Sequence, residues 1–345
     1  MKISRVIVAG LLCFILLITG CGKEISTDEF NIGNSENVEG NSNDKQETIG
    51  TVSHGVNWSE EEEEYSFIYN GEQLEIPYVM NGSGICTSVG FLIYMDGIPQ
   101  PYMIKGTDEE YKYMHVIEGE ENIDKKFVIS FMPVTGKAGD KVSMSINSIA
   151  NPLFIPDMVN TFDYGMSHQS LEAVYAITFQ QNAECALEVT DELSIMSNVS
   201  NKQTDIDKEE KKYIQDKSLE PELDLDTSVY SDLIIDNNSM FVDSKLDIAD
   251  KNVVHVSYIM MGHPGIKYKV NFYLNHQLIS DKSKNINEIE LTTGKMTTIE
   301  FDLDVSEFTD GTFYAVAVPV NADDYPADGI QTIKYQSIHL YRGEN

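Results

Sequence analysis

The stretch from Val253 to Leu274, VVHVSYIMMGHPGIKYKVNFYL, decides the fold of this sequence. It holds two strand-like runs, rich in Val, Ile, Tyr and Phe, on either side of a segment that contains Gly and Pro. Similar runs follow at Gln277–Ile279, Met296–Val305, Thr312–Val320 and Ile330–Tyr341. Turns therefore recur about every 8 to 12 residues, which is typical of an all-β sandwich and not of alternating helices and strands.

The region from residue 57 to 190 shows the same kind of pattern. Apolar and polar residues alternate on both sides of Asn70-Gly71, a pair that favours tight turns, so we expect a β-hairpin there. The run from Val89 to Met95 is almost entirely apolar, which predicts a strand buried on both faces. Further strands are expected at Lys126–Val134, Lys141–Ile149 and Leu171–Phe179.

One segment near the C-terminus resembles known domains. Asp310 to Val316 (DGTFYAV) looks like the start of the penultimate strand of immunoglobulin-like and fibronectin type III-like domains, where a Tyr hydroxyl ties the corner. The segment lacks the Cys of true immunoglobulin domains, so the resemblance extends to architecture only. Together with the strand patterns, it predicts an all-β fold with two immunoglobulin-like β-sandwich domains, at residues 57–190 and 228–345.

The N-terminus has the pattern of an export signal. Lys2 and Arg5 precede the apolar run Val6–Ile18, which at about 13 residues is too short for a membrane-spanning helix. The residues Ile18-Thr19-Gly20-Cys21 resemble the lipobox of bacterial lipoprotein signal peptides. This resemblance implies a signal peptide at residues 1–20, a diacylglycerol on the Cys21 thiol and acyl chains in the outer leaflet of a cell membrane. An ordinary secretory signal followed by a chance cysteine is the alternative.

Two segments outside the predicted sandwiches are polar. Residues 21–56 are rich in Asn, Ser, Gly and Glu without periodicity, so we expect a disordered tether that begins with the lipidated cysteine. Residues 191–227 are rich in acids and lysines and poor in aromatics. This composition predicts a charged linker between the two domains, with a short helix near Lys208–Gln215.

The chain is strongly acidic. It carries 56 Asp and Glu against 24 Lys and Arg, which gives a formal net charge of −32. Such a field repels phosphate backbones, and Arg342 is the one arginine left once residues 1–20 are removed, so nucleic acid is excluded as a partner. The same charge repels an anionic membrane surface, so the lipid on Cys21 is expected to provide the membrane attachment.

Two cysteines, Cys86 and Cys185, remain after Cys13 leaves with the signal and Cys21 takes lipid. Export permits a disulfide between them. Two free thiols are the alternative, because sequence spacing does not show whether their Cα atoms approach within bridging distance.

Two aromatic segments of the first domain form the candidate binding surface. Residues 151–170 are a long connection with prolines and aromatics, and long loops inside compact domains are often functional. Residues 111–115 hold a second aromatic patch. The binding residues predicted from these segments are Tyr111, Tyr113, Phe154, Met158, Phe162 and Tyr164. A packed crossover without a binding role is the alternative for the long connection.

The sequence shows no catalytic arrangement with the spacing that its chemistry requires. Gly165-Met166-Ser167-His168-Gln169 lacks the last glycine of a nucleophile elbow and lies in a predicted loop. The seven histidines include no pair at the His-x-x-x-His spacing of zinc enzymes, and we expect them on strand or loop surfaces. No cofactor is predicted, with one alternative: calcium bound by the hard carboxylate oxygens of Asp323, Asp324 and Asp328.

These observations predict a lipoprotein on the extracytoplasmic face of the cell membrane that is not an enzyme. It is expected to act as a binding or accessory module for an envelope protein or polysaccharide. One alternative is a solute-binding lipoprotein of an ABC transporter, a class that usually alternates strands and helices in two lobes. Another is a secreted hydrolase whose catalytic carboxylates the sequence does not place.

Overall fold

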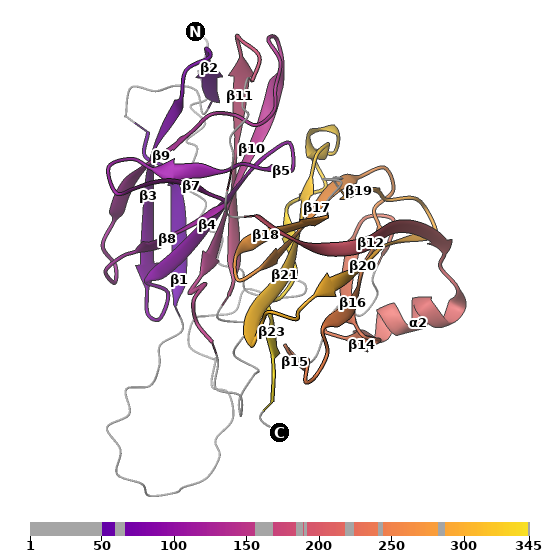
Figure 1. The fold of residues 1–345 in the computed structure, drawn as a ribbon. Helices are drawn as coiled ribbons and strands as arrows, with labels where there is room; N and C mark the ends of the chain where they lie inside the picture. Colours follow the sequence, from indigo (N-terminus) through magenta and orange to yellow (C-terminus); the bar gives the residue numbers. More distant parts are fainter. Residues whose placement is uncertain are drawn as a thin grey trace, which may run out of the picture. The chain divides into compact units, whose positions relative to one another are not determined.

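The computed structural model of the chain describes residues 50–58, 66–155, 168–183, 189, 192–217, 224–240, 244–281 and 287–343. Strands and the turns between them make up these residues, apart from one α-helix, α2 (Lys208–Lys217), and one 3-10 helix, η1 (Ala322–Asp324). Within the described ranges, no helix is long and apolar enough to span a membrane. The prediction of an all-β chain with β-sandwich architecture is confirmed (Figure 1). The predicted signal peptide, Cys21 and the tether as far as residue 49 lie outside the described residues.

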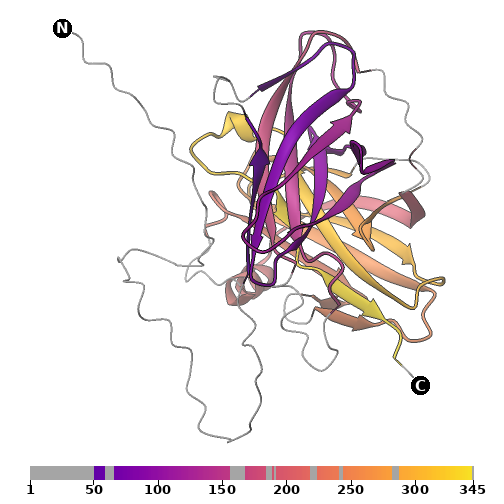
Figure 2. The same cartoon turned by 90° about the vertical axis from the view of Figure 1, so that its left-hand side faces the viewer.

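The first sandwich consists of two facing sheets, drawn in indigo to magenta in Figure 1 and seen from another side in Figure 2. The first sheet has the strand order β1 (Thr51–Val56), β3 (Leu74–Ser83), β9 (Lys125–Phe131), β6 (Tyr102–Ile104) and β7 (Asp108–Lys112). The second sheet has the order β2 (Ser66–Tyr69), β11 (Ser170–Phe179), β10 (Lys141–Ala150), β4 (Ser88–Met95) and β5 (Ile98–Pro99), with β8 (Met114–Glu118) paired to β4.

The core of the first sandwich follows from the period-two pattern of its strands. Along β3, the residues Leu74, Ile76, Tyr78 and Met80 are buried and those between them are more exposed, so one face of the strand turns inward. These side chains pack against apolar residues of β4, β10 and β11 in the second sheet. Burial of this apolar surface is what holds the two sheets together.

The prediction of a β-hairpin at Asn70-Gly71 is wrong. Strand β2 pairs in parallel with β11, whereas β3 pairs with β1 and β9 in the facing sheet. The chain therefore crosses from one sheet to the other at this pair. Gly71 has a φ of 95°, which glycine adopts without strain, so the pair forms a turn but joins strands of different sheets.

The second sandwich is a twelve-stranded third sheet whose two halves face each other. Its main path is β14 (Asn238–Ser239), β13 (Val229–Ile235), β16 (Val253–Gly262), β20 (Lys295–Asp304), β12 (Glu192–Asp205), β18 (Gln277–Asp281), β17 (Lys267–Leu274), β21 (Asp310–Pro319), β23 (Ile338–Tyr341) and β15 (Lys245–Asp247). Two short strands, β19 (Asn287–Glu290) and β22 (Ile333–Lys334), pair with β17 and β21. Buried residues of β16 and β20 pack against those of β17 and β21 to form the core.

Strand β12 joins the two halves of the third sheet. Its first residues pair in parallel with β18, and from Met196 onward it pairs antiparallel with β20. The register shifts between Ser197 and Ser200, where Asn198 has a φ of 54°. This bulge lies within the pairing with β20, after β12 has left β18 at Met196.

Two strands lie in segments that the sequence predicted as connections. Strand β1 falls within the predicted tether 21–56, and β12 falls within the predicted linker 191–227. Most β12 residues are polar and exposed or half-buried, so this strand has no apolar alternation to reveal it. The helix predicted near Lys208–Gln215 is present as α2, and Asp207 Oδ1 caps it by accepting two backbone N–H groups at 2.8 Å.

The two sandwiches meet through the outer faces of the second and third sheets. Leu92 and Tyr94 of β4 belong to one buried cluster with Tyr273 of β17 and Tyr314 of β21. Every residue from Val89 to Met95 is buried, because one face of β4 lies in the first core and the other lies in this interface. The prediction of a strand buried on both faces is therefore confirmed.

Candidate binding cleft between the two sandwiches

A cleft of ≈ 300 Å³ lies between the two sandwiches. Its wall in the first sandwich consists of Ile98, Pro99, Tyr113 and Val134. Its wall in the second sandwich consists of Glu192, Met196, Val199, Val270, Asn271, Phe272, Leu278, Ile279, Ser280 and Asp281. Most of the lining is apolar, and both acidic side chains belong to the second wall.

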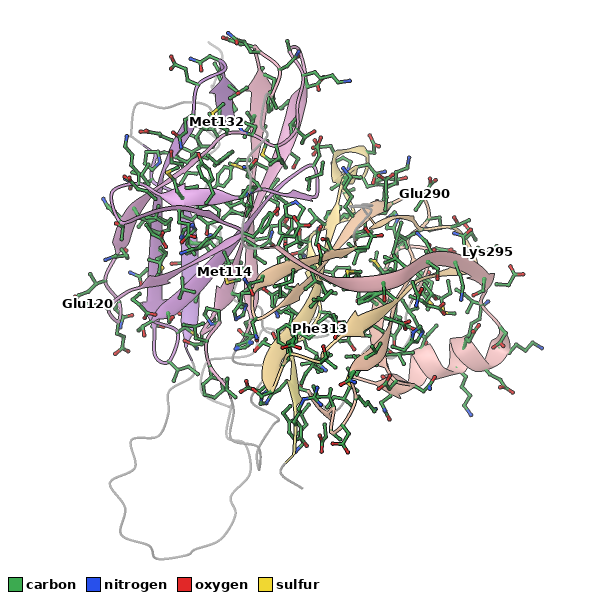
Figure 3. The ribbon with its side chains drawn as sticks, in the orientation of Figure 1. Met114, Glu120, Met132, Glu290, Lys295 and Phe313 are labelled. Atoms are coloured by element: carbon green, nitrogen blue, oxygen red, sulfur yellow. The ribbon has the colours of Figure 1, made fainter. Side chains whose placement is uncertain are left out.

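Tyr113 supplies the aromatic side chain of the first wall. It stands between β7 of the first sheet and β8 of the second sheet, so the chain changes sheets at this residue. The next residue, Met114, packs in the interface between the sandwiches and is labelled in Figure 3. His115 Nε2 donates to the carbonyl oxygen of Tyr102 at 2.8 Å, and its backbone N–H donates to the Tyr102 hydroxyl at 3.1 Å. The residues that follow Tyr113 therefore hold it at the cleft.

Glu192 and Asp281 place two carboxylates at the second wall. The parallel pairing of β12 with β18 sets Glu192 opposite Leu278 and Met196 opposite Asp281. The hydroxyl of Ser280 donates to the Glu192 carboxylate and fixes its position. The cleft thus offers negative charge beside apolar surface, a combination that suits an apolar group carrying a positive charge.

Two hydrogen bonds across the interface fix the position of the first wall. Lys269 Nζ donates to the carbonyl oxygen of Asp96 at 2.8 Å, and Asn271 Nδ2 donates to that of Gly97 at 3.1 Å. Asp96 and Gly97 form the turn that leads into β5, which carries Ile98 and Pro99 to the cleft. Burial of the Asp96 carboxyl raises its pKa above the usual value.

A buried polar network lies in the same interface. The rings of Tyr273 and Tyr314 stack, with centroids 5.2 Å apart. His276 Nε2 donates to the carbonyl oxygen of Pro152 at 2.6 Å, so its Nδ1 accepts from the Tyr314 hydroxyl at 3.1 Å. Burial lowers the pKa of His276 to about 4, so the ring is neutral at pH 7.

A second polar link joins β11 to the segment before β22. Glu172 Oε2 accepts the backbone N–H of Thr332 at 2.8 Å, and Oε1 accepts the Thr332 hydroxyl at 2.5 Å. The hydroxyl of Ser145 donates to the same Oε1 at 2.5 Å. Hydrogen bonds to a carboxylate are stronger than those between neutral groups, so this link helps to keep the two walls of the cleft in one arrangement.

Of the other predicted binding residues, the two that the structure describes, Tyr111 and Phe154, do not line the cleft. Tyr111 is half-buried on the first sandwich, where its hydroxyl accepts a hydrogen bond from Gln73 Nε2 at 2.9 Å. Phe154 is exposed in the loop after β10, and its carbonyl oxygen accepts from His168 Nε2 at 3.1 Å. Three further predicted residues, Met158, Phe162 and Tyr164, lie outside the described residues.

The prediction that all histidines lie at the surface is wrong. Those that are buried are His115, His168, His263 and His339. His54 of β1 is partly buried and joins the two sheets of the first sandwich. Its Nε2 donates to the carbonyl oxygen of Leu171 at 3.1 Å, and its Nδ1 accepts from the Tyr78 hydroxyl at 2.7 Å. Burial lowers its pKa to about 4. A neutral imidazole with both nitrogens paired fits a protein interior, and no local sequence pattern reports such pairing.

The three aspartates predicted as calcium ligands are not gathered into a metal site. Asp323 and Asp324 lie in η1, and the Asp328 carboxylate lies 3.2 Å from His263 Nε2. Among the residues that the structure describes, no group of three or more His, Cys, Asp and Glu side chains is placed to hold a metal ion.

Cys86 is a buried cysteine, with its Sγ 3.8 Å from Asn151 Nδ2. Burial raises the pKa of its thiol. Cys185 lies outside the described residues, so a disulfide between the two stays a prediction.

Comparisons with known proteins do not identify a family for this chain. No protein-family model and no curated protein matches the chain. Matching structures include the Salmonella enterica SafA pilin in complex with the SafB chaperone, at 8% identity over 84% of this chain and 95% of that chain, with a TM-score of 0.23. WR4, a C. elegans MSP family member, matches at 11% identity over 38% of this chain and 98% of that chain, with a TM-score of 0.21. The C-terminal domain of the Streptococcus agalactiae AgI/II polypeptide BspA matches at 9% identity over 84% and 100%, with a TM-score of 0.20. Similarities this low say nothing about function.

Proposed function

We propose that this chain is a lipid-anchored extracytoplasmic protein that binds a partner in the cleft between its two sandwiches and catalyses no reaction. The observation that carries the proposal is the position of Tyr113, an aromatic residue that lines a cleft with apolar and acidic walls. The lipobox-like residues that end at Cys21 support the anchor.

The cleft has the features of a site for one or two side chains of a partner protein. Binding pockets are mostly apolar with a few placed polar groups, and ≈ 300 Å³ is at the small end of their range. A Tyr in such a position is typical of residues that dominate binding energy. The negative charge of Glu192 and Asp281 attracts a Lys or Arg of the partner. The hydrogen bonds to Asp96 and Gly97 fix the first wall of the cleft before binding, which lowers the cost of association.

The occupant that fits best is a segment of an envelope protein with an apolar and a basic side chain. A neutral polysaccharide offers neither the basic group nor the aliphatic side chains that match these walls. The alternative of a solute-binding lipoprotein predicts strands and helices that alternate in two lobes. The described residues consist almost entirely of strands and do not show this alternation.

Photo-crosslinking from the first wall tests the proposal. A photoreactive amino acid at position 113 is expected to capture an envelope protein in intact cells. The matched control is the same amino acid at position 111, which belongs to the same aromatic patch but lies outside the cleft, and it should capture much less. Equal capture from both positions, or capture of polysaccharide alone, would contradict the proposed site.

Lipid labelling tests the anchor separately. Labelled palmitate should enter the wild-type chain and should not enter a Cys21→Ser variant. Wild-type protein that takes up no label would refute the anchor and leave the cleft experiment unaffected.

A further inference from the structure

Exposed apolar side chains gather in three loops at one end of the first sandwich. Each of them is between 42% and 68% exposed to solvent. We call this set the apolar end, and it consists of Ile85, Ile123, Leu153, Phe154 and Ile155. Scattered exposed apolar residues need no explanation, but a cluster in neighbouring loops marks an interaction surface.

The strand register shows that these loops share one end. In β4, Ser88 pairs with Glu118 at the end of β8, and Val89 pairs with Ala150 at the end of β10. The turn before β4, the loop after β8 and the loop after β10 therefore emerge together. Their backbones touch: Asn151 N–H donates to the carbonyl oxygen of Ser88 at 2.7 Å, and Asn122 N–H donates to that of Gly82 at 2.7 Å.

Gly50 and Thr51, where the described chain begins, lie at this same end. Thr51, the first residue of β1, pairs with Ser83 at the end of β3. Gly50 lies against the turn that carries Ile85, since a Cβ at Gly50 would come within 2.5 Å of Cys86 Sγ. About 30 residues separate Cys21 from Gly50, and even a fully extended chain of that length spans no more than about 110 Å.

We infer that the apolar end rests on the bilayer that holds the acyl chains of Cys21, with Leu153, Phe154 and Ile155 among the lipid headgroups. The inference rests on the lipid anchor of the proposed function. Because the anchor keeps these loops within reach of the bilayer, the contact is intramolecular in effect, and a small apolar surface with weak affinity of its own is enough. The apolar end lies where the described chain begins, on the side of the sandwich that the anchor would tether. This position favours the bilayer over a protein partner as its occupant.

Charge determines which lipids suit this surface. The loop after β8, with the strand ends that flank it, carries four exposed acids against two exposed lysines: Glu118, Glu120, Glu121, Asp124, Lys125 and Lys126. Glu120 projects outward from its loop in Figure 3. The excess of negative charge repels anionic headgroups, so the contact is driven by apolar burial and should be stronger on zwitterionic than on anionic lipid.

Tryptophan quenching in vesicles tests the inference with the full lipidated chain. The chain has a single Trp, Trp58, which is replaced by Phe in all variants. A Phe154→Trp reporter in vesicles of brominated phosphatidylcholine is expected to lose emission by about twofold relative to unbrominated vesicles, because its ring sits among the lipids. The quenching should weaken when half of the lipid is phosphatidylglycerol.

The matched control is an Ile68→Trp reporter. Ile68 is similarly exposed, but it pairs with Thr178 near the end of β11, whereas the apolar end lies where β11 begins. It should show no quenching. Ile123→Trp gives a second reporter from another loop, should Phe154→Trp fail to fold.

Three outcomes decide the matter. Quenching at position 154 or 123 and not at position 68 supports the inference. Reporters at 154 and 123 that stay unquenched on vesicle-bound protein overturn it. Failure of the lipidated chain to float with the vesicles overturns the anchor itself and the inference with it.

Discussion

The hydroxyl oxygens of Tyr94 and Tyr273 lie 2.9 Å apart in the buried interface between the two sandwiches. Tyr94 comes from β4 and Tyr273 from β17, so this hydrogen bond joins two sheets that belong to different cores. Burial raises the pKa of both phenols above the usual range, so the pair is neutral at pH 7.

Removing one hydroxyl of this pair should destabilise the chain. Tyr94→Phe is expected to lower the free energy of unfolding by about 1 to 3 kcal/mol, because the hydroxyl of Tyr273 is then buried without this partner. The double variant Tyr94→Phe/Tyr273→Phe should cost less than the sum of the two single variants, since no hydroxyl is left to satisfy. Urea unfolding of the four proteins gives the coupling energy.

The control for this cycle is Tyr341→Phe. Tyr341 is partly buried at the end of β23, away from the interface, and its change should stay within about 0.5 kcal/mol. Strictly additive losses for Tyr94 and Tyr273 would show that the two hydroxyls do not depend on each other.

Gly262 at the end of β16 should tolerate no larger residue without a large loss of stability. Its φ is 113°, and a Cβ would lie 2.0 Å from the carbonyl oxygen of Ser228. Gly262→Ala is therefore expected to cost more than about 2 kcal/mol, since the backbone of β13 must move. Thermal unfolding measures the loss.

Gly294 supplies the comparison. It also has a positive φ, of 69°, but a Cβ there meets nothing within 4 Å. Gly294→Ala should cost about 1 kcal/mol, the strain of the backbone alone. Similar melting temperatures for the two variants would mean that the contact with Ser228 is relieved cheaply.

The fold could be predicted where burial leaves a periodic trace. The apolar run from Val89 to Met95 indicated a strand with two buried faces. Odd-numbered residues of β4 pack in the first core, and Leu92 and Tyr94 pack in the interface between the sandwiches. Strand β12 left no such trace, since its polar residues face solvent and it is held by backbone pairing with β18 and β20. The turn at Asn70-Gly71 was recognised, but a turn does not say which sheet each flanking strand joins.

The candidate site was predicted only in part. Tyr113 stood out as an aromatic residue in a charged segment, and it does line a cleft. The opposite wall comes from segments distant in sequence, such as Glu192 and Leu278, which are brought together by a parallel strand pairing. Spacing along the chain carries no information on contacts between sheets, so neither the cleft nor its acidic side could be foreseen.

Two histidines, His276 and His168, make stability depend on pH. Burial lowers the pKa of His276 to about 4 and that of His168 to about 3, from a usual value of 6.5. Between these values and 6.5 the unfolded chain binds more protons than the folded chain, so stability is complete above pH 6.5 and falls as the pH falls. For His276 alone the loss should reach roughly 3 kcal/mol by pH 4.

A His276→Gln variant isolates this contribution. The Gln amide can donate to the carbonyl oxygen of Pro152, as His276 does at 2.6 Å, but it has no proton to gain below pH 6.5. The variant should melt at a lower temperature than the wild type at pH 7.5, because Gln fits the site less well. It should lose less stability than the wild type between pH 7 and pH 4.5, because it has no imidazole to protonate. Melting curves across this range decide the point: parallel pH profiles for the two proteins would show that protonation of His276 contributes nothing to the loss of stability. A profile that is flatter for the variant means that protonation of this ring in the interface is a cause of the destabilisation at acid pH.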